Sequence, residues 1–470
     1  MQNYPIYAAG EFVTTAHGHE VRNPHDGNLI ARTWLADGTV LEKCIVAAQQ
    51  VQQAMKEMPS WKKFSILRKI SDTIVENRHR LATVLCRESG KPIRYALAEI
   101  DRAAQTFLVA AEEAKRLPKE FISLDWTPVG ERKEGFVKYF PIGIVAGIAP
   151  FNFPMNLAVH KIAPAIAAGC PIILKPASST PLSMLELARI IDATELPKGA
   201  VSILPMDRVA GNQLVTDERF SLLTFTGSPE VGWEMKKNAG KKKVVLELGG
   251  NAGVIVARTA EIESALKRCL VGAFAYSGQI CIHAQRLFVH SSLYSTFLQR
   301  FSEMTAGLKN GNPEDNSTDV GVMIDEANAK RVEEWVNEAV KAGAKIVCGG
   351  TRSKSYYHPT ILTGTNSKMK VCSEEVFGPV VTIEPFDNFT DAVRMINETR
   401  FGLQAGVFTN DLSETEIAFN EIQTGGVIIN DVPTFRVDHM PYGGVKDSGL
   451  GREGVKYAIM DMLEARILVK

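Results

Sequence analysis

The regular alternation of short apolar runs with helical stretches constrains the fold of this chain more than any other feature. The apolar runs that predict buried strands lie at residues 142–148, 171–174, 201–204 and 221–225. Stretches with helical character lie between them, at residues 156–168 and 182–193. Strands joined by crossover helices run parallel, and a parallel sheet is covered on both faces. The sequence therefore predicts an α/β fold with a doubly wound parallel sheet.

The rest of the chain extends this pattern beyond one domain. Before the sheet, we expect amphipathic helices at residues 39–58, 65–88 and 95–117. A second alternating section runs from residue 252 to about residue 430, with helices at 262–275 and 293–308. Between the two sections, an apolar run at 244–246 leads into Gly249 and Gly250, which predicts a crossing between domains. A chain of 470 residues exceeds one ordinary core, so two or three domains are expected.

A hairpin and the C-terminal segment predict a smaller β element. Residues 120–139 are rich in aromatic and β-branched residues around a Pro128-Val129-Gly130 turn, which is typical of two paired strands. The chain ends in an apolar segment at 467–469, and a single terminal strand is not stable by itself. We expect this strand to join the hairpin in an oligomerisation element and to pair across subunits of a homodimer or homotetramer.

Composition excludes several classes of protein. The chain has 53 lysine and arginine residues against 53 aspartate and glutamate residues, so it has no net attraction to nucleic acid or anionic membrane. Its longest apolar stretch, residues 142–149, is too short to span a membrane, and its start lacks the pattern of a signal peptide. Seven cysteines without a Cys-x-x-Cys pair argue against disulfides and a zinc site. We expect a cytoplasmic protein with no metal, nucleic-acid or membrane partner.

Two segments that follow predicted strands are candidates for binding phosphate or nucleotide. Ser228 suits the N-cap of a helix and Pro229 its first position, and a helix N-terminus directly after a parallel strand can bind phosphate. The spacing from Gly227 to Gly232 is not the usual dinucleotide fingerprint, so a plain strand–helix turn is an equal alternative. Lys175 ends another predicted strand, where open α/β sheets bind ligands, although an exposed lysine also fits there.

Three further residues are candidates for catalysis. Cys281 follows a helix and a close-approach glycine, Gly278, which makes it the best nucleophile among cysteines that are otherwise typical of a core. Glu247 lies in an apolar run, where a carboxylate either is paired structurally or has a raised pKa for proton transfer. Asn152 stands between two phenylalanines and two prolines, as an oxyanion donor or as a turn residue.

Seven motifs, in this order and at these spacings, resemble the aldehyde dehydrogenase superfamily. They are Pro-Phe-Asn-Phe-Pro at 150–154, Lys-Pro-Ala at 175–177, Phe-Thr-Gly-Ser at 225–228, Glu-Leu-Gly-Gly at 247–250, Gly-Gln-Ile-Cys at 278–281, Glu-Glu-Val-Phe-Gly-Pro at 374–379 and Tyr-Gly-Gly-Val-Lys-Asp-Ser-Gly at 442–449. The resemblance spans nearly the whole chain and includes enzymes for lactaldehyde and glyceraldehyde. It implies a nucleotide-binding domain at 1–119 and 139–248, a catalytic domain at 249–435, an oligomerisation element at 120–138 and 455–470, and a return segment at 436–454.

The resemblance also implies a mechanism. Cys281 matches the nucleophile, which adds to the aldehyde as a thiolate to give a thiohemiacetal and then a thioester. The amide of Asn152 and the backbone N–H of Cys281 match the oxyanion hole. Glu247 matches the base that activates water, and its presence favours hydrolysis to a free acid over transfer to coenzyme A.

The cofactor implied by the resemblance is NAD or NADP. The matching cofactor positions are Lys175, Ser178, Gly227, Ser228, Gly249, Glu375 and Phe377. Lys175 and Glu375 match ribose contacts, and Phe377 packs near the nicotinamide. Ser228 matches a contact to the pyrophosphate. Many NAD-selective members have a glutamate where this chain has Ser178, so NADP should be tolerated here because no carboxylate repels its 2′-phosphate.

Substrate preference is the least constrained feature. The positions that match the substrate pocket are His160, Ile280, Ile282, Arg436 and His439. This partly polar set favours a short aldehyde with a hydroxyl group or an anionic tail, unless Arg436 points outward to a surface acid. Ala275 replaces an arginine typical of succinate-semialdehyde enzymes, which disfavours that substrate. The alternatives are a coenzyme A-acylating semialdehyde dehydrogenase and a non-catalytic structural protein of the same fold, as some lens crystallins are.

Overall fold

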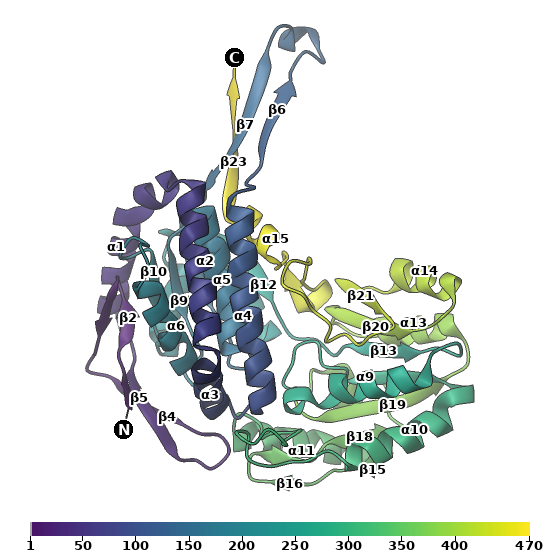
Figure 1. Cartoon of the computed structure of the whole chain (residues 1–470). Coiled ribbons are helices and arrows are strands. Elements are labelled where there is room, and N and C mark those ends of the chain that lie inside the picture. Colours follow the sequence, from purple (N-terminus) through teal and green to yellow (C-terminus); the bar gives the residue numbers. More distant parts are fainter. Residues whose placement is uncertain (1) are drawn as a thin grey trace.

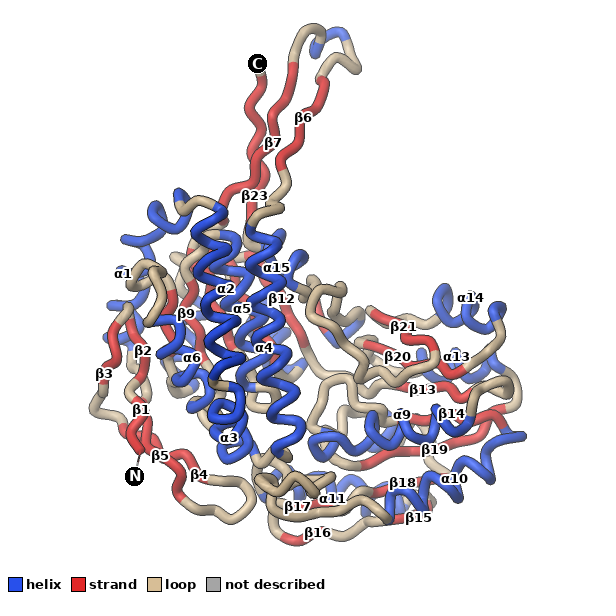
Figure 2. Tube along the Cα trace, viewed as in Figure 1, coloured by secondary structure: helices blue, strands red, loops and turns tan. Residues whose placement is uncertain are grey.

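An eight-stranded sheet organises the first unit of the molecule (Figures 1 and 2). The computed structural model describes residues 2–470. The strand order is β22-β12-β11-β8-β9-β10-β2-β3. The strands are β2 (Ile6–Ala8), β3 (Glu11–Val13), β8 (Ile144–Ile148), β9 (Ile172–Lys175), β10 (Val201–Ile203), β11 (Phe220–Thr226), β12 (Lys243–Glu247) and β22 (Gly449–Leu450). The five strands β8 to β12 run parallel, which confirms the doubly wound fold.

The order of these strands creates a switch point. The strands β9 and β10 lie on one side of β8, whereas β11 and β12 lie on the other side. The connections that leave the carboxyl ends of β8 and β11 therefore turn in opposite directions. Open α/β sheets bind ligands at such a point, and here residues 149–152 and 227–228 surround it.

Helices cover both faces of this sheet, as a parallel sheet requires. One face packs against α1 (Gly38–Glu57), α7 (Arg208–Thr216) and α8 (Pro229–Asn238). The other packs against α5 (Pro154–Ala168), α6 (Leu182–Asp192) and α15 (Val455–Asp461). An outer layer of α2 (Ser60–Glu76), α3 (Arg78–Ser89) and α4 (Ile93–Ala114) packs on these helices. Within β8, Ile144 and Ala146 face the first group and Val145 the second.

The prediction of one helix over residues 65–88 is wrong. The structure has two helices there, α2 and α3, which meet at Asn77. Asn77 leaves the helical conformation (φ −99°, ψ 12°), and its side-chain amide donates a hydrogen bond of 2.9 Å to the carbonyl of Thr73. An asparagine side chain that bonds the backbone competes with the helical hydrogen bonds, and this competition ends α2.

A seven-stranded sheet organises the second unit, in the order β15-β18-β19-β14-β13-β20-β21. Its strands are β13 (Gly253–Val256), β14 (Arg286–His290), β15 (Lys345–Cys348), β18 (Thr360–Thr363), β19 (Val380–Phe386), β20 (Gln404–Phe408) and β21 (Gly426–Ile429). The helices α9 (Ile262–Phe274) and α10 (Ser291–Ala306) cover one face, and α13 (Phe389–Asn397) and α14 (Leu412–Glu421) cover the other. The helices α11 (Glu326–Lys341) and α12 (Lys370–Ser373) pack around β18. Gly249 and Gly250 connect β12 to β13, at the predicted crossing.

A three-stranded arm projects from the first unit, and the chain ends near its tip (Figure 1). It consists of β6 (Lys119–Ser123), β7 (Glu134–Pro141) and β23 (Leu463–Val469), with a 3₁₀ turn at Pro128–Gly130. The C-terminal strand joins the hairpin as expected, because β23 pairs along its whole length with β7 of the same chain. Within residues 2–470 the other edge of β23 has no partner strand, so pairing across subunits stays a prediction. The apolar end is therefore already a sheet strand before any partner binds.

Small elements complete the structure. A three-stranded sheet contains β1 (Gln2–Tyr4), β5 (Leu29–Trp34) and β4 (Gly18–Arg22), and a hairpin contains β16 (Arg352–Ser353) and β17 (Tyr356–Tyr357). Two 3₁₀ turns, η2 (Ala275–Gly278) and η3 (Lys446–Ser448), lie near the site described below. None of the helices within residues 2–470 is long and apolar enough to cross a membrane.

Candidate active site

A cavity of about 700 Å³ opens at the carboxyl edge of the first sheet, lined by residues of both units. The loops that follow β8, β11 and β12 form one wall, and loops of the second unit form the other. Eight of the residues predicted from the sequence line it together, namely Asn152, Gly227, Ser228, Glu247, Gly249, Cys281, Glu375 and Phe377. The switch point of the sheet is therefore where these residues meet.

The loop that presents Cys281 has an unusual backbone. Tyr276 (φ 48°), Ser277 (φ 55°) and Gly278 (φ 67°) are three consecutive left-handed residues in η2, which follows α9. A Cβ atom at Gly278 would lie 2.2 Å from the carbonyl oxygen of Gly378, so only glycine fits there. This contact packs the loop of Cys281 against the loop that carries Glu375 and Phe377.

Asn152 and Cys281 are linked through the backbone. The Asn152 side-chain amide donates a hydrogen bond of 3.0 Å to the carbonyl of Gln279, two residues before Cys281. Asn152 also lines the cavity, and this is the only hydrogen bond that its amide makes within the described residues. The surrounding protein raises the pKa of the Cys281 thiol to about 11 by desolvation. The thiolate therefore needs specific stabilisation if it is to form near neutral pH.

Glu247 is buried at the end of β12, beside the cavity. Neither of its carboxylate oxygens has a hydrogen-bond partner within residues 2–470. Burial, followed by the negative charge of Glu453, raises the pKa of Glu247 well above its usual range. A Cβ atom at Gly443 would lie 2.9 Å from Glu247 Oε1, so the glycine keeps space beside this carboxylate. A carboxylate with these properties is suited to accept a proton.

The side of the cavity where the sequence predicts cofactor binding has a helix end and a carboxylate. Ser228 is the N-cap of α8 and Pro229 its first residue, as predicted, and the Ser228 hydroxyl makes no capping hydrogen bond. Glu375 Oε1 accepts a hydrogen bond of 3.0 Å from the backbone N–H of Gly250. Burial raises the pKa of Glu375 to about 8. A Cβ atom at Gly249 would lie 2.2 Å from Glu375 Oε2, so this glycine is required for the close approach.

The remaining cofactor positions lie around the cavity and beyond it. The ring of Phe377 meets that of Phe151 edge to face, with 5.8 Å between centroids. Lys175 and Ser178 are half-buried near the end of β9 and are outside the residues that line the cavity. Burial lowers the pKa of Lys175, and the Ser178 carbonyl accepts a hydrogen bond of 2.8 Å from the His19 ring.

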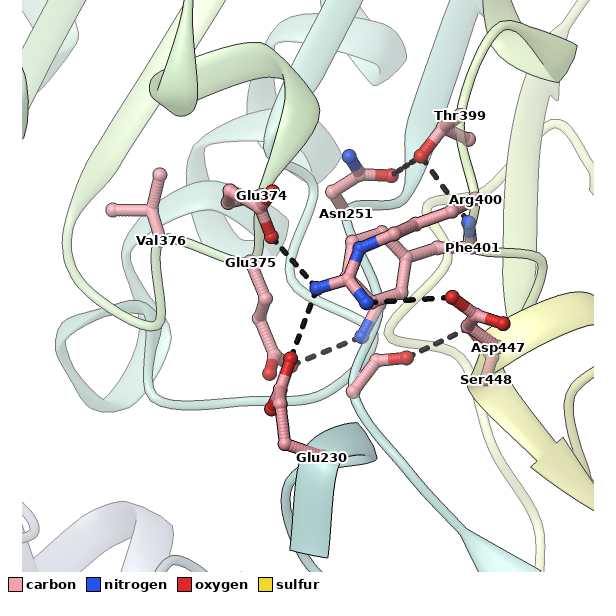
Figure 3. A network of polar contacts seen from close by, with 12 residues as sticks. Glu230, Asn251, Glu374, Glu375, Val376, Thr399, Arg400, Phe401, Asp447 and Ser448 are labelled. Carbon is pink, nitrogen blue, oxygen red and sulfur yellow. Dashed lines mark hydrogen bonds and ion pairs between the residues drawn. The ribbon is translucent and has the colours of Figure 1, made fainter. Parts of the chain in front are cut away.

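Arg400 joins three parts of the chain at the edge of the cavity (Figure 3). Its Nη2 atom lies 3.0 Å from Glu230 Oε1 in α8 and 2.8 Å from Glu374 Oε2 in the second unit. Its Nη1 atom lies 3.3 Å from Asp447 Oδ2 in the return segment. We call these four residues the outer charge network. All four side chains are more than one third exposed, between 37% and 67%.

A second set of charges lies deeper, behind Glu247. We call it the inner charge network, and it comprises Arg102, His160, Lys161, Arg436, Asp438 and Glu453. Glu453 lies 3.3 Å from Lys161 Nζ and 2.9 Å from Arg436 Nη2. Although burial raises it, these two cations lower the pKa of Glu453 to about 2. Asp438 Oδ1 accepts hydrogen bonds from Arg102 (2.7 Å) and from the His160 ring (2.9 Å).

None of the expected substrate-pocket positions is among the residues that line the cavity. His160 and Arg436 lie inside the molecule, so the alternative in which Arg436 points to a surface acid is wrong. Ile280 and Ile282 are buried on either side of Cys281. His439 is exposed instead, like its neighbours Phe435 and Val437.

Sequence reasoning missed four members of the inner charge network. These are Arg102, Lys161, Asp438 and Glu453. One feature could have indicated the network, because Lys161 is a charged residue within α5, a helix in which every residue is buried. A lysine on such a helix is almost never fully buried without a partner. No group of three or more His, Cys, Asp or Glu side chains in the described part of the chain could hold a metal ion.

Comparison with known proteins agrees with this architecture. The model of the aldehyde dehydrogenase family matches residues 12–468. A 3-sulfolactaldehyde dehydrogenase from Priestia megaterium is 43% identical over 100% of this chain and 98% of its own length.

Two solved structures are similar over nearly their whole length. Aldehyde dehydrogenase 21 from Physcomitrella patens, in complex with its reaction product succinate, superposes with a TM-score of 0.98, is 44% identical, and aligns over 100% of this chain and 98% of its own. Glyceraldehyde-3-phosphate dehydrogenase GapN from Methanocaldococcus jannaschii, in complex with NADP, gives a TM-score of 0.92 at 36% identity, over 96% of this chain and 98% of its own.

Proposed function

The chain belongs to the aldehyde dehydrogenase family, and from that premise we propose that it oxidises a short anionic or hydroxylated aldehyde to the free acid with NAD or NADP. The single observation that best supports this proposal is the meeting of Cys281, Asn152 and Glu247 at one cavity. Nucleophile, oxyanion donor and base come from different loops, and aldehyde oxidation through a thioester needs all three.

The first half of the proposed reaction belongs to Cys281 and Asn152. The Cys281 thiolate adds to the aldehyde carbon, the C–S bond forms, and negative charge moves to the carbonyl oxygen. The free N–H of the Asn152 amide and the Cys281 backbone N–H donate hydrogen bonds to that oxygen. When bound, NAD or NADP supplies the hydride acceptor, and loss of hydride from the carbon leaves a thioester on Cys281.

The second half belongs to Glu247. Its carboxylate takes a proton from water, the resulting hydroxide adds to the thioester carbon, and the Cys281 thiolate leaves as the acid forms. The raised pKa of Glu247 makes it a stronger base than a solvent-exposed carboxylate. This base supports a hydrolytic enzyme rather than one that transfers the acyl group to coenzyme A.

The residues present fit a dinucleotide. The N-terminus of α8 at the switch point offers unpaired backbone N–H groups to a pyrophosphate. Glu375, half-buried in the cavity, is placed to accept hydrogen bonds from ribose hydroxyls. Ser178 adds no negative charge near β9, which supports use of NADP beside NAD.

The inner charge network supports an anionic substrate. It holds three cationic side chains against two carboxylates, while burial lowers the pKa of His160 and keeps it neutral. The Nε atoms of Arg102 and Arg436 are buried without a hydrogen-bond partner in the described chain. Buried donors without partners are rare, and an anionic tail would supply the missing acceptors.

The similar proteins named above support the same class. Their names refer to an aldehyde with a sulfonate, a product with two carboxylates and an aldehyde with a phosphate. The shared chemistry is a short aldehyde with an anionic group at the far end. We therefore extend the proposal to a sulfonate, carboxylate or phosphate tail held by Arg436 and Arg102.

We further propose a cytoplasmic homo-oligomer. All seven cysteines are free, which supports a reducing compartment. The arm exposes apolar side chains, with Trp126 89% and Val129 84% exposed. Apolar surface of this kind is typical of a contact between subunits.

The test is an assay of reduced-cofactor formation over a panel of aldehydes, with NAD and NADP, in the absence and presence of coenzyme A. We expect turnover with sulfonate-, carboxylate- or phosphate-bearing short aldehydes without coenzyme A, and none in Cys281→Ala. Turnover only with long or aromatic aldehydes would overturn the substrate class. A requirement for coenzyme A would overturn the role of Glu247.

A further inference from the structure

Tyr442 touches the sulfur of Cys281, and the mechanism above does not use it. Its hydroxyl oxygen lies 3.1 Å from Cys281 Sγ, within hydrogen-bond range for sulfur. Within residues 2–470 this phenol is the only side chain that hydrogen-bonds the thiol. Tyr442 is 2% exposed, and its backbone forms two hydrogen bonds with Glu453, of 2.6 and 3.0 Å. The contact is therefore held by the fold rather than by a mobile surface side chain.

The environment of the phenol favours donation over acceptance. Burial raises the pKa of Tyr442 well above its usual range, so the hydroxyl keeps its proton. The guanidinium of Arg436 stacks on the ring, with its carbon 3.7 Å from the ring centroid. A cation over an aromatic face withdraws electron density, which makes the hydroxyl a better donor and a poorer acceptor. A thiolate accepts such a proton more strongly than a thiol does.

We propose that Tyr442 is a further catalytic residue, whose hydroxyl donates a hydrogen bond to the Cys281 thiolate. The inference rests on Cys281 being the nucleophile of the proposed function. The hydrogen bond stabilises the thiolate before it adds to the aldehyde. During hydrolysis the same bond stabilises the thiolate as it leaves the thioester carbon, because a thiol of lower pKa is a better leaving group.

The hydrogen bond from Tyr442 counteracts the effect of burial on the pKa of the Cys281 thiol. Desolvation raises the pKa of Cys281 to about 11, and the hydrogen bond from Tyr442 is the largest effect that lowers it. Arg436 contacts two of these residues, because it forms an ion pair with Glu453 and stacks on the ring of Tyr442. A phenylalanine at position 442 would preserve the stacking and lose only the donor.

The test is the variant Tyr442→Phe, which removes one oxygen atom. The pH dependence of Cys281 alkylation by iodoacetamide is measured on the cofactor-free protein by mass spectrometry, with Cys281→Ala as the background for the other cysteines. We expect the apparent pKa of the thiol to rise by about one unit in Tyr442→Phe. Alkylation at pH 7.5 should then slow about tenfold, because the thiolate is the reactive form.

Tyr357→Phe is the matched control. Tyr357 is also buried, and its hydroxyl has no hydrogen-bond partner among the described residues. Its loss should leave the alkylation profile unchanged. An unchanged profile in Tyr442→Phe would overturn the inference, and a lower thiol pKa would overturn it by showing that the thiol donates to the phenol. Neither result would affect the proposed function, which fails instead if Cys281→Ala oxidises aldehydes.

Discussion

Arg436 and Arg400 each hold carboxylates near the same site, but they do so in opposite environments. The side chains of Arg436 and Glu453 are 5% and 2% exposed, whereas those of Arg400 and Glu374 are 39% and 37% exposed. A buried pair costs desolvation, and removing one partner leaves an uncompensated charge. An exposed pair contributes little and is screened by salt. Changes in the inner charge network should therefore affect both catalysis and the free energy of unfolding. The ion pairs of the outer charge network should instead rearrange when a ligand binds.

The largest expected effect comes from Arg436→Met. It leaves Glu453 buried with one cation fewer, and we expect the free energy of unfolding to fall by about 3 kcal/mol. Denaturant unfolding measures this loss, and KM for anionic aldehydes should rise in the same variant. Arg436→Lys, which keeps a cation beside Glu453, should lose much less stability. If Arg436→Lys loses as much as Arg436→Met, the loss comes from packing rather than from the unpaired charge.

A second effect is expected at Glu375, whose side chain is half-buried and thus intermediate in exposure between the two networks. Its ionised carboxylate is needed to accept hydrogen bonds from ribose hydroxyls. Because burial raises its pKa to about 8, the group is protonated below that pH. Cofactor affinity should therefore rise with pH, by about tenfold between pH 7 and pH 9, because one unit of pKa corresponds to a tenfold change. Titration of the protein with NAD or NADP at each pH measures this affinity. Glu375→Gln should bind with no such pH dependence, and a flat profile in the unmodified protein would contradict the role.

The smallest effect is expected from Arg400→Met, the exposed counterpart of Arg436→Met. Its three ion pairs are exposed, so the free energy of unfolding should fall by less than about 1 kcal/mol. The difference should vanish in about 0.5 M salt, where the Debye length is short. A loss as large as that of Arg436→Met, or one that survives salt, would erase the distinction between the two networks.

Local patterns predicted most of the fold and the catalytic loops. Apolar runs at 142–148 and 221–225 became β8 and β11, because buried parallel strands need continuous apolar sequence. Asn152 and Ser228 follow those strands, so a parallel arrangement brings both loops to one edge. The break at Asn77 was not predicted, because helical periodicity continues across it and only a side-chain hydrogen bond ends α2.

The inner charge network could not be predicted in the same way. Arg436 and Glu453 lie in the return segment, whereas Arg102 and Lys161 lie on α4 and α5. Their pairing depends on how the return segment packs against these two helices, and no local pattern encodes that. By contrast, the expected joining of the C-terminal strand to the hairpin agrees with the pairing of β23 and β7.

The proposed role of Glu247, which activates water for hydrolysis of a Cys281 thioester, can be tested with the variant Glu247→Gln. After mixing with an accepted aldehyde and saturating NAD or NADP, reduced cofactor is followed in a stopped-flow spectrometer. We expect a burst of about one equivalent per Cys281, followed by turnover slowed at least about 100-fold, because the general base is lost. Steady-state turnover equal to that of the unmodified protein, with no burst, would contradict it.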